Sequence, residues 1–183
     1  MKIEKTDIPG ILILTPKVFG DERGFFLESF NKKIFQQAGI EGEFVQDNHS
    51  KSTQGVVRGL HYQKKFPQGK LIRVIQGEVL DVIVDIRRGS PTYARWISIL
   101  LTAENKKQVW IPAGLAHGFS VLSETAEFFY KVTDYYHPED EAGIRWDDPQ
   151  LNIDWQVKTP LLSKKDAKLP LLAEIGEDLP EFH

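Results

Sequence analysis

The chain has 183 residues, a length that suits one domain, and 41% of them are hydrophobic, which is enough to form a full core. Its net charge of −3, without a basic block, argues against nucleic-acid binding as the main activity. Four of the first ten residues are charged, and no apolar run approaches the roughly 18 residues of a membrane span. Because cysteine is also absent, we expect a soluble, cytoplasmic protein without disulfides and without membrane contact.

Short runs of alternating apolar and polar residues, separated by Gly and Pro, predict an all-β protein. One short helix is expected over 31–39, where Asn31 suits the N-cap and Gly39 the C-terminal stop. The segment from roughly 160 to 183 contains three prolines and little periodicity, which predicts a wrapping tail with one short helical turn. The expected strands, in chain order, are 10–16, 24–30, 43–50, 56–63, 70–77, 78–87, 95–102, 107–112, 117–123 and 126–136.

Strand alternation predicts which side chains share a face. Along 78–87, Asp81 falls on the same face as Val79 and Ile83, and a carboxylate buried there would need a partner. Polar residues line one face of the strand 43–50, and one face of the strand 126–136 carries both apolar and polar side chains. In a small barrel, such faces indicate a ligand cavity.

The stretch "VVRGLHYQ" (56–63) carries Arg58 and His61 in an otherwise apolar strand, and Lys70 follows in the next one. Cations placed in this way suggest an anionic or electron-rich ligand. A strict period of two puts Arg58 and His61 on opposite faces of the strand. A bulge at Gly59 would re-aim one of them, and the alternation alone leaves this open.

Two segments resemble the paired motifs of the cupin superfamily: "GLHYQ" and "PAGLAHGF" (112–119), which has the spacing P-x-G-x-x-H. Gln63 stands where metal-binding cupins have a second histidine, and the glutamate expected soon after it is missing. A transition-metal site needs about three such protein ligands, and only two histidines are available. The sequence therefore predicts one domain over 1–183, a cupin-like jelly-roll β-barrel with a short helix and a C-terminal tail, without a metal.

A single histidine or tyrosine in a strand more often has a structural role than a functional one. His61 departs from this rule because Arg58 and Lys70 accompany it, and nearby cations keep an imidazole neutral and available as a base. Tyr130 is more often a core aromatic, although its hydroxyl could serve as an acid in a cavity. Tyr136 is either a turn residue or a stacking platform for an aromatic ring.

Five segments in order resemble the dTDP-4-dehydrorhamnose 3,5-epimerase family and cover nearly the whole chain. They are "DERGFFLESF" (21–30), "FVQDNHSKSTQGVVRGLHYQ" (44–63), the stretch from "QGKLIRV" to "GSPTY" (68–93), the stretch from "WIPAGLAHGF" to "RWDDP" (110–149), and "LLSKKD" (161–166). The resemblance implies epimerisation of dTDP-4-dehydro-6-deoxyglucose through enolates, without a cofactor or metal.

The resemblance also implies residue roles. His61 resembles the family's base, Asp166 its partner, Lys70 the group that stabilises the enolate oxygen, and Tyr130 the acid on the opposite side. Tyr136 matches a tyrosine that stacks on thymine. Positions matching substrate-holding residues are Arg23, Glu28, Gln46, Asn48, Arg58, His117, Glu141 and Lys165, and Asp81 and Phe26 match pocket positions without a specific role.

Members of the family are homodimers in which an arm crosses to the partner, so residues near Arg23 and Glu28 are expected to serve the neighbour's site. Four alternatives stay open from the motifs: an epimerase acting at one carbon, a sugar-nucleotide ketoisomerase, a binding-only cupin, and a metal-dependent oxygenase. A binding module would have no use for the combination of His61, Asp166 and Tyr130, which favours an enzyme.

Overall fold

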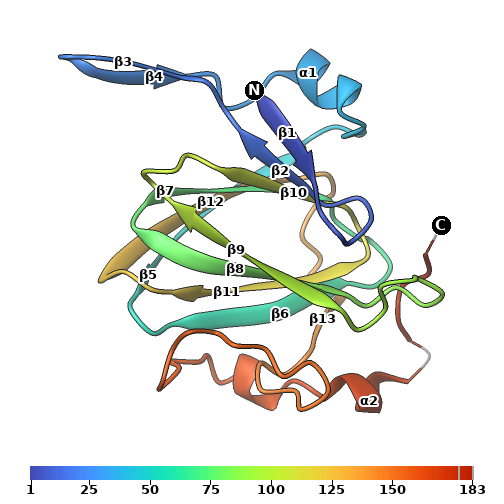
Figure 1. Cartoon of the computed structure of the whole chain (residues 1–183). Helices are drawn as coiled ribbons and strands as arrows, with labels where there is room; N and C mark the ends of the chain where they lie inside the picture. The colour runs from blue at the N-terminus through green and yellow to red at the C-terminus, as the bar shows by residue number, and fades with distance from the viewer. Residues whose placement is uncertain (177, 183) are drawn as a thin grey trace.

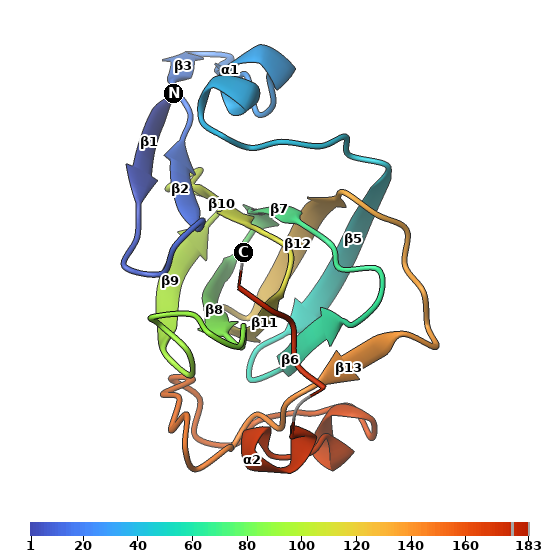
Figure 2. The same cartoon turned by 90° about the vertical axis from the view of Figure 1, so that its right-hand side faces the viewer.

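The computed structural model describes residues 1–176 and 178–182, and two antiparallel sheets lie face to face in it (Figures 1 and 2). The six-stranded sheet has the order β1 (Lys2–Lys5), β2 (Leu12–Thr15), β10 (Gln108–Ile111), β7 (Lys70–Gln76), β12 (Thr125–Val132) and β5 (Gln46–Thr53). The five-stranded sheet has the order β13 (Glu141–Gly143), β6 (Val57–Gln63), β11 (Leu115–Val121), β8 (Glu78–Asp85) and β9 (Trp96–Thr102). This is the cupin-like barrel that the sequence predicts.

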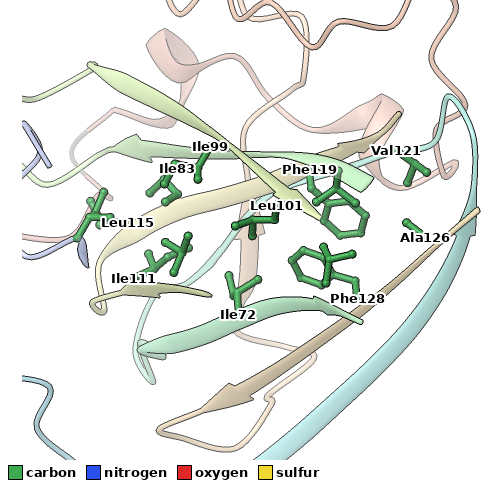
Figure 3. Packing of buried hydrophobic residues seen from close by; sticks show 14 of the residues in the cluster. Ile72, Ile83, Ile99, Leu101, Ile111, Leu115, Phe119, Val121, Ala126 and Phe128 are labelled. Carbon is green, nitrogen blue, oxygen red and sulfur yellow. The ribbon is translucent and has the colours of Figure 1, made fainter. Parts of the chain in front are cut away.

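Residues from both sheets fill the space between them (Figure 3). Phe119 from β11 and Phe128 from β12 stack at the centre with their rings 4.2 Å apart. Val79 and Ile83 belong to this core, whereas Leu80 and its even-numbered neighbours in β8 pack in a second cluster on the sheet's other side. The predicted alternation of 78–87 is thus confirmed, and it places Asp81 inside the barrel.

The C-terminal segment covers the outer face of the five-stranded sheet, seen in orange and red in Figures 1 and 2. It contains a 3₁₀ turn, η1 (Asp166–Lys168), and one turn of α-helix, α2 (Leu172–Ile175), which is one helical turn more than the sequence predicts. Short bridges attach it to the barrel, where Leu161 lies beside Val56 and Glu181 beside Arg88. The tail therefore brings Asp166 to the end of β6.

The helix predicted over 31–39 is α1 (Lys32–Gln37), and the Asn31 side chain accepts a hydrogen bond from the backbone N–H of Ile34, as an N-cap should. The strand expected over 126–136 ends earlier, at Val132, because 133–140 forms a loop in which the Asp140 carboxylate accepts backbone hydrogen bonds from Lys65 and Phe66. No helix in the described ranges is long and apolar enough to cross a bilayer.

A hairpin of β3 (Val18–Asp21) and β4 (Gly24–Leu27) projects from the barrel as a separate two-stranded sheet (Figure 1). Its aromatic side chains are exposed to solvent, by 53% for Phe19, 60% for Phe25 and 69% for Phe26. A lone two-stranded hairpin is marginal in water, and clustered exposed aromatics of this kind mark interaction surfaces.

Candidate active site

A cavity of about 490 Å³ lies between the two sheets, with walls from β5, β6, β7, β11, β12 and β13 and from the segment 163–166. It brings together most of the residues predicted from the sequence. Those lining it are Asn48, Arg58, His61, Lys70, His117, Tyr130, Tyr136, Glu141, Lys165 and Asp166.

A bulge in β6 puts Arg58 and His61 into the same cavity. His61 pairs with His117 of β11, and Arg58 pairs with Phe119. An advance of three residues along β6 therefore matches an advance of two residues along β11. Gly59 has φ +103°, a backbone conformation that L residues rarely adopt. This register settles the question that alternation left open: the strand has an irregularity at Gly59, and Arg58 and His61 share the cavity.

We expect the Gly59→Ala variant to lose about 2–4 kcal/mol of unfolding free energy, from backbone strain and from overpacking. A Cβ at this position would lie 2.6 Å from the carbonyl oxygen of His117, which is backbone and cannot easily move. Urea denaturation followed by fluorescence measures the loss. Gly39→Ala is the matched control, because Gly39 also has a positive φ but its Cβ would meet nothing within 4 Å. Equal losses in the two variants would contradict the steric argument.

His61 and Asp166 form a tight pair, although 105 positions separate them. His61 Nε2 lies 2.7 Å from Asp166 Oδ1, and the aspartate is only 4% exposed. Burial raises the pKa of Asp166, but hydrogen bonds from His61 and Ser163 outweigh this and hold the pKa below its ordinary value. An ionised partner at Nε2 fixes the tautomer with a proton there, which leaves Nδ1 as the free basic nitrogen.

Lys70 and Tyr130 stand on the six-stranded sheet, across the cavity from His61. Burial lowers the pKa of Lys70 to about 8, while the negative charges of Asp81 and Glu141 oppose that shift. Burial, followed by the charge of Glu141, raises the pKa of Tyr130, so its hydroxyl stays protonated at neutral pH. The cavity therefore places a cation and a proton donor opposite the His61 imidazole.

Glu141 contacts three other residues that line the cavity. Its Oε2 accepts hydrogen bonds from the Tyr136 hydroxyl and from Lys165 Nζ, the latter at 2.6 Å, while Oε1 lies 3.8 Å from His61 Nε2. Gln46 lies beside this group, donating to Asn48 Oδ1 at 2.9 Å and accepting from the backbone N–H of Tyr136 at 3.2 Å. These contacts join the side chains of Gln46, Asn48, Tyr136, Glu141 and Lys165 in one hydrogen-bonded group.

Five predicted site residues are absent from the cavity lining: Gln46 lies beside the cavity, Asp81 is buried next to it, and the other three lie on or after the β3–β4 hairpin. Arg23 and Phe26 lie on the hairpin, and Glu28 follows it, all exposed. Arg23 pairs with Asp21 of the same hairpin at 2.5 Å.

The resemblance predicts Asp81 at a pocket position, without a specific role. It is 0% exposed and is not part of the cavity lining; its Oδ2 accepts a hydrogen bond from His117 Nε2 at 2.8 Å. Alternation correctly put Asp81 inside the barrel, but alternation does not report whether an inward side chain reaches the surface of a cavity.

Some lining residues lie outside the predicted site, namely Ser50, Gln63, Gln68, Phe119, Phe128 and Ser163. Alternation with Asn48 and Tyr130 could have found Ser50 and Phe128. Gln63 holds the adjoining loops: it donates to the carbonyl of Phe66 at 2.6 Å and accepts from the backbone N–H of His137 at 2.8 Å. Within the described residues, no group of three or more His, Asp or Glu side chains is arranged to hold a metal ion.

The two-sheet barrel, with a His–Asp pair, a lysine and a tyrosine around one polar cavity, defines a cupin-type protein with an acid–base site. A family model described as dTDP-4-dehydrorhamnose 3,5-epimerase matches residues 5–174, and the chain belongs to this family.

Similar proteins agree with the family assignment. The chain is 60% identical to a dTDP-4-dehydrorhamnose 3,5-epimerase of Shigella flexneri, over 91% of this chain and 93% of the relative. A crystal structure of dTDP-6-deoxy-D-glucose-3,5-epimerase from Legionella pneumophila, in complex with dTDP-4-keto-L-rhamnose, superposes with a TM-score of 0.97 at 54% identity, covering 100% of this chain and 98% of that one. A 3'-monoepimerase from Streptomyces bikiniensis, in complex with dTDP-quinovose, has a TM-score of 0.91 at 35% identity, covering 96% and 91%.

Proposed function

We propose that the protein epimerises C3 and C5 of dTDP-4-dehydro-6-deoxy-D-glucose, giving dTDP-4-dehydro-L-rhamnose without a cofactor. The observation that carries this proposal is the His61–Asp166 pair, which shares one cavity with Lys70 and Tyr130 on the facing sheet. Base, cation and acid are the three groups that inversion beside a ketone requires. The names and identities of the relatives support the same reaction.

In the proposed reaction, His61 Nδ1 takes the proton from the carbon beside the C4 ketone. The C–H electron pair becomes the enolate double bond, and the carbonyl π electrons move to O4, where Lys70 stabilises the negative charge. Tyr130 then donates its proton to the opposite face of the carbon, and solvent returns the tyrosine and histidine to their starting states. A positioned base typically contributes about 10²–10⁴ in rate, and one oxyanion donor about 3–4 kcal/mol.

The outer part of the cavity suits the nucleotide. Arg58 and Lys165 are placed for a diphosphate, Tyr136 for stacking on thymine, and Gln46, Asn48, His117 and Glu141 for the sugar. Arg58 Nε already donates to Ser52 Oγ at 3.1 Å, which holds the guanidinium at the cavity. A diphosphate that recruits Lys165 must compete with Glu141 for its ammonium group.

Relatives that act on one carbon share the fold, so the fold does not distinguish inversion at one carbon from inversion at both C3 and C5. The Streptomyces bikiniensis 3'-monoepimerase is 35% identical to this chain, whereas the Shigella flexneri 3,5-epimerase is 60% identical, which favours double epimerisation. Proton NMR of the substrate with enzyme in D₂O tests it. Deuterium entering at both C3 and C5 supports the proposal, and deuterium at only one carbon would show a single-site epimerase.

We further propose a homodimer in which the β3–β4 hairpin reaches the partner's cavity. The hairpin's exposed phenylalanines support an interface, and β5, which carries Gln46 and Asn48, is an open edge of the six-stranded sheet. An arm placed there would bring Arg23, Phe26 and Glu28 to the partner's site. Sedimentation equilibrium tests the dimer, and a monomer at micromolar concentration would contradict it.

We expect Arg58→Lys to raise KM about tenfold or more while kcat changes by less than about threefold. Lysine keeps the positive charge but loses the planar fork that binds a diphosphate in two places. Steady-state kinetics measures both constants. Arg95→Lys, an exposed arginine outside the cavity lining, is the matched control. An unchanged KM in Arg58→Lys would show that Arg58 does not hold the diphosphate.

A further inference from the structure

Gln63 is a buried polar side chain at the end of β6 that the proposed reaction leaves without a role. It is only 6% exposed, and it lines the cavity. It also stands at the position where metal-binding cupins have a second histidine. A buried side-chain amide has two N–H donors and a carbonyl acceptor that all need partners, so its contacts indicate what the residue does.

The Gln63 amide binds three backbone groups in two loops. Nε2 donates to the carbonyl of Phe66 at 2.6 Å, in the loop that follows β6, and to the carbonyl of Tyr135 at 3.3 Å, in the loop between β12 and β13. Oε1 accepts from the backbone N–H of His137 at 2.8 Å. Two of these three groups therefore belong to the peptide units immediately before and immediately after the Cα atom of Tyr136.

Tyr136 depends on its backbone to hold its ring at the cavity, because 47% of the residue is exposed. Within the described residues, its own hydrogen bonds run from the hydroxyl to Glu141 and from the backbone N–H to Gln46 Oε1, the latter at 3.2 Å. Peptide units are planar, so the two units on either side of a Cα atom set the direction of its side chain. Gln63 binds both of these units around Tyr136.

We propose that Gln63 is a positioning residue for nucleotide binding: it fixes the two peptide units around Tyr136 and so holds the tyrosine ring where a base stacks on it. This inference rests on the function proposed above, in which Tyr136 stacks on thymine. A ring that is already ordered loses less conformational freedom when the ligand binds, which raises affinity. Gln63 therefore acts on the binding of the nucleotide and not on the chemical step.

Other contacts also join the two loops. Gln68 Nε2 donates to the carbonyl of Asp134 at 2.8 Å, and the rings of Phe66 and His137 stack with their centroids 4.2 Å apart. These contacts do not involve the amide of Gln63, so they should keep the loops folded when that amide is replaced. A substitution of Gln63 should then alter the orientation of the tyrosine ring more than the fold.

Gln63→Met tests this inference, because methionine has a similar length but cannot make the three hydrogen bonds. We expect dTDP to bind about tenfold more weakly, a factor within the range that stacking of one base on an aromatic ring contributes. Inorganic pyrophosphate, which has no base, should bind within about twofold of its native affinity. Isothermal titration calorimetry measures both affinities. In steady-state kinetics, KM should rise about tenfold while kcat changes by less than about threefold.

Gln54→Met is the matched control for this variant. Gln54 also donates to a backbone carbonyl, that of Leu122 at 2.7 Å, but it is exposed and lies outside the cavity lining. The control should leave both affinities and both kinetic constants unchanged.

A double-mutant cycle with Tyr136→Ala distinguishes positioning of the ring from a general loss of structure. If Gln63 acts through that ring, Gln63→Met should weaken dTDP binding by less than about twofold once the ring is absent. Losses that multiply in the double variant, or equal losses for dTDP and pyrophosphate, would overturn the inference. So would a Tyr136→Ala variant that binds dTDP as tightly as the native protein does.

The tests of this inference and of the proposed reaction can fail separately, because the binding cycle needs no turnover. Losses that do not multiply uphold the role of Gln63 even where no deuterium enters the substrate. Losses that multiply in an active epimerase reject the role of Gln63 and leave the reaction standing. If Gln63→Met does not fold, Gln63→Asn replaces it in the same cycle with the same expected and opposing results, since its amide is one methylene too short to reach all three backbone groups.

Discussion

Replacing His61 by Asn should lower kcat by about 10²–10⁴, the usual contribution of a positioned base. Asparagine can still donate a hydrogen bond from its amide to Asp166, which lies 2.7 Å from His61 Nε2 in the native protein, but it cannot accept a proton from carbon. Deuterium should then fail to enter the substrate at C3 and at C5 in D₂O. Proton NMR follows both positions in one experiment.

Binding of dTDP is the control for this variant. Isothermal titration calorimetry should give an affinity within about twofold of the native protein, because Arg58, Lys165 and Tyr136 are untouched. Continued deuterium uptake in His61→Asn would mean that another group removes the proton. Glu141, whose Oε1 lies 3.8 Å from His61 Nε2, would then be the first candidate to examine.

Replacing Tyr130 by Phe should separate proton removal from inversion. The ring can keep its packing against Phe128, at 5.9 Å between centroids, while the hydroxyl that returns the proton is lost. Formation of dTDP-4-dehydro-L-rhamnose should fall by about 10²–10⁴, since a general acid contributes over this range. Deuterium should still enter the unreacted substrate with retained configuration, because His61 can remove a proton and return a deuteron on one face.

The comparison that decides this prediction is the ratio of exchange to epimerisation, measured by NMR in the same samples. Tyr93→Phe provides the control, since Tyr93 is 40% exposed and lies outside the cavity lining. It should leave both rates unchanged. Exchange and epimerisation that fall in parallel in Tyr130→Phe would show that Tyr130 is not the acid on the opposite face.

Alternation along single strands predicted much of the barrel, because side chains in a strand point to opposite faces with a period of two. Residues 78–87 show this best: the odd-numbered apolar residues lie in the core and the even-numbered ones lie under the C-terminal segment. Three strands were outside the predictions, namely β1, β3 and β13. They are three or four residues long, and β13 forms by pairing with β6, which no local pattern reports.

The sequence by itself determined the all-β fold class, the short capped helix, and the concentration of cations around His61, because these depend on local patterning and residue type. Tertiary structure alone decided which residues meet. Asp166 reaches His61 because the tail returns across the five-stranded sheet, and Arg58 joins His61 because Gly59 allows a close approach to β11. Asp81 binds His117 without lining the cavity for the same reason: the packing of the two sheets decides which inward side chains reach the cavity, and a strand's own sequence does not record it.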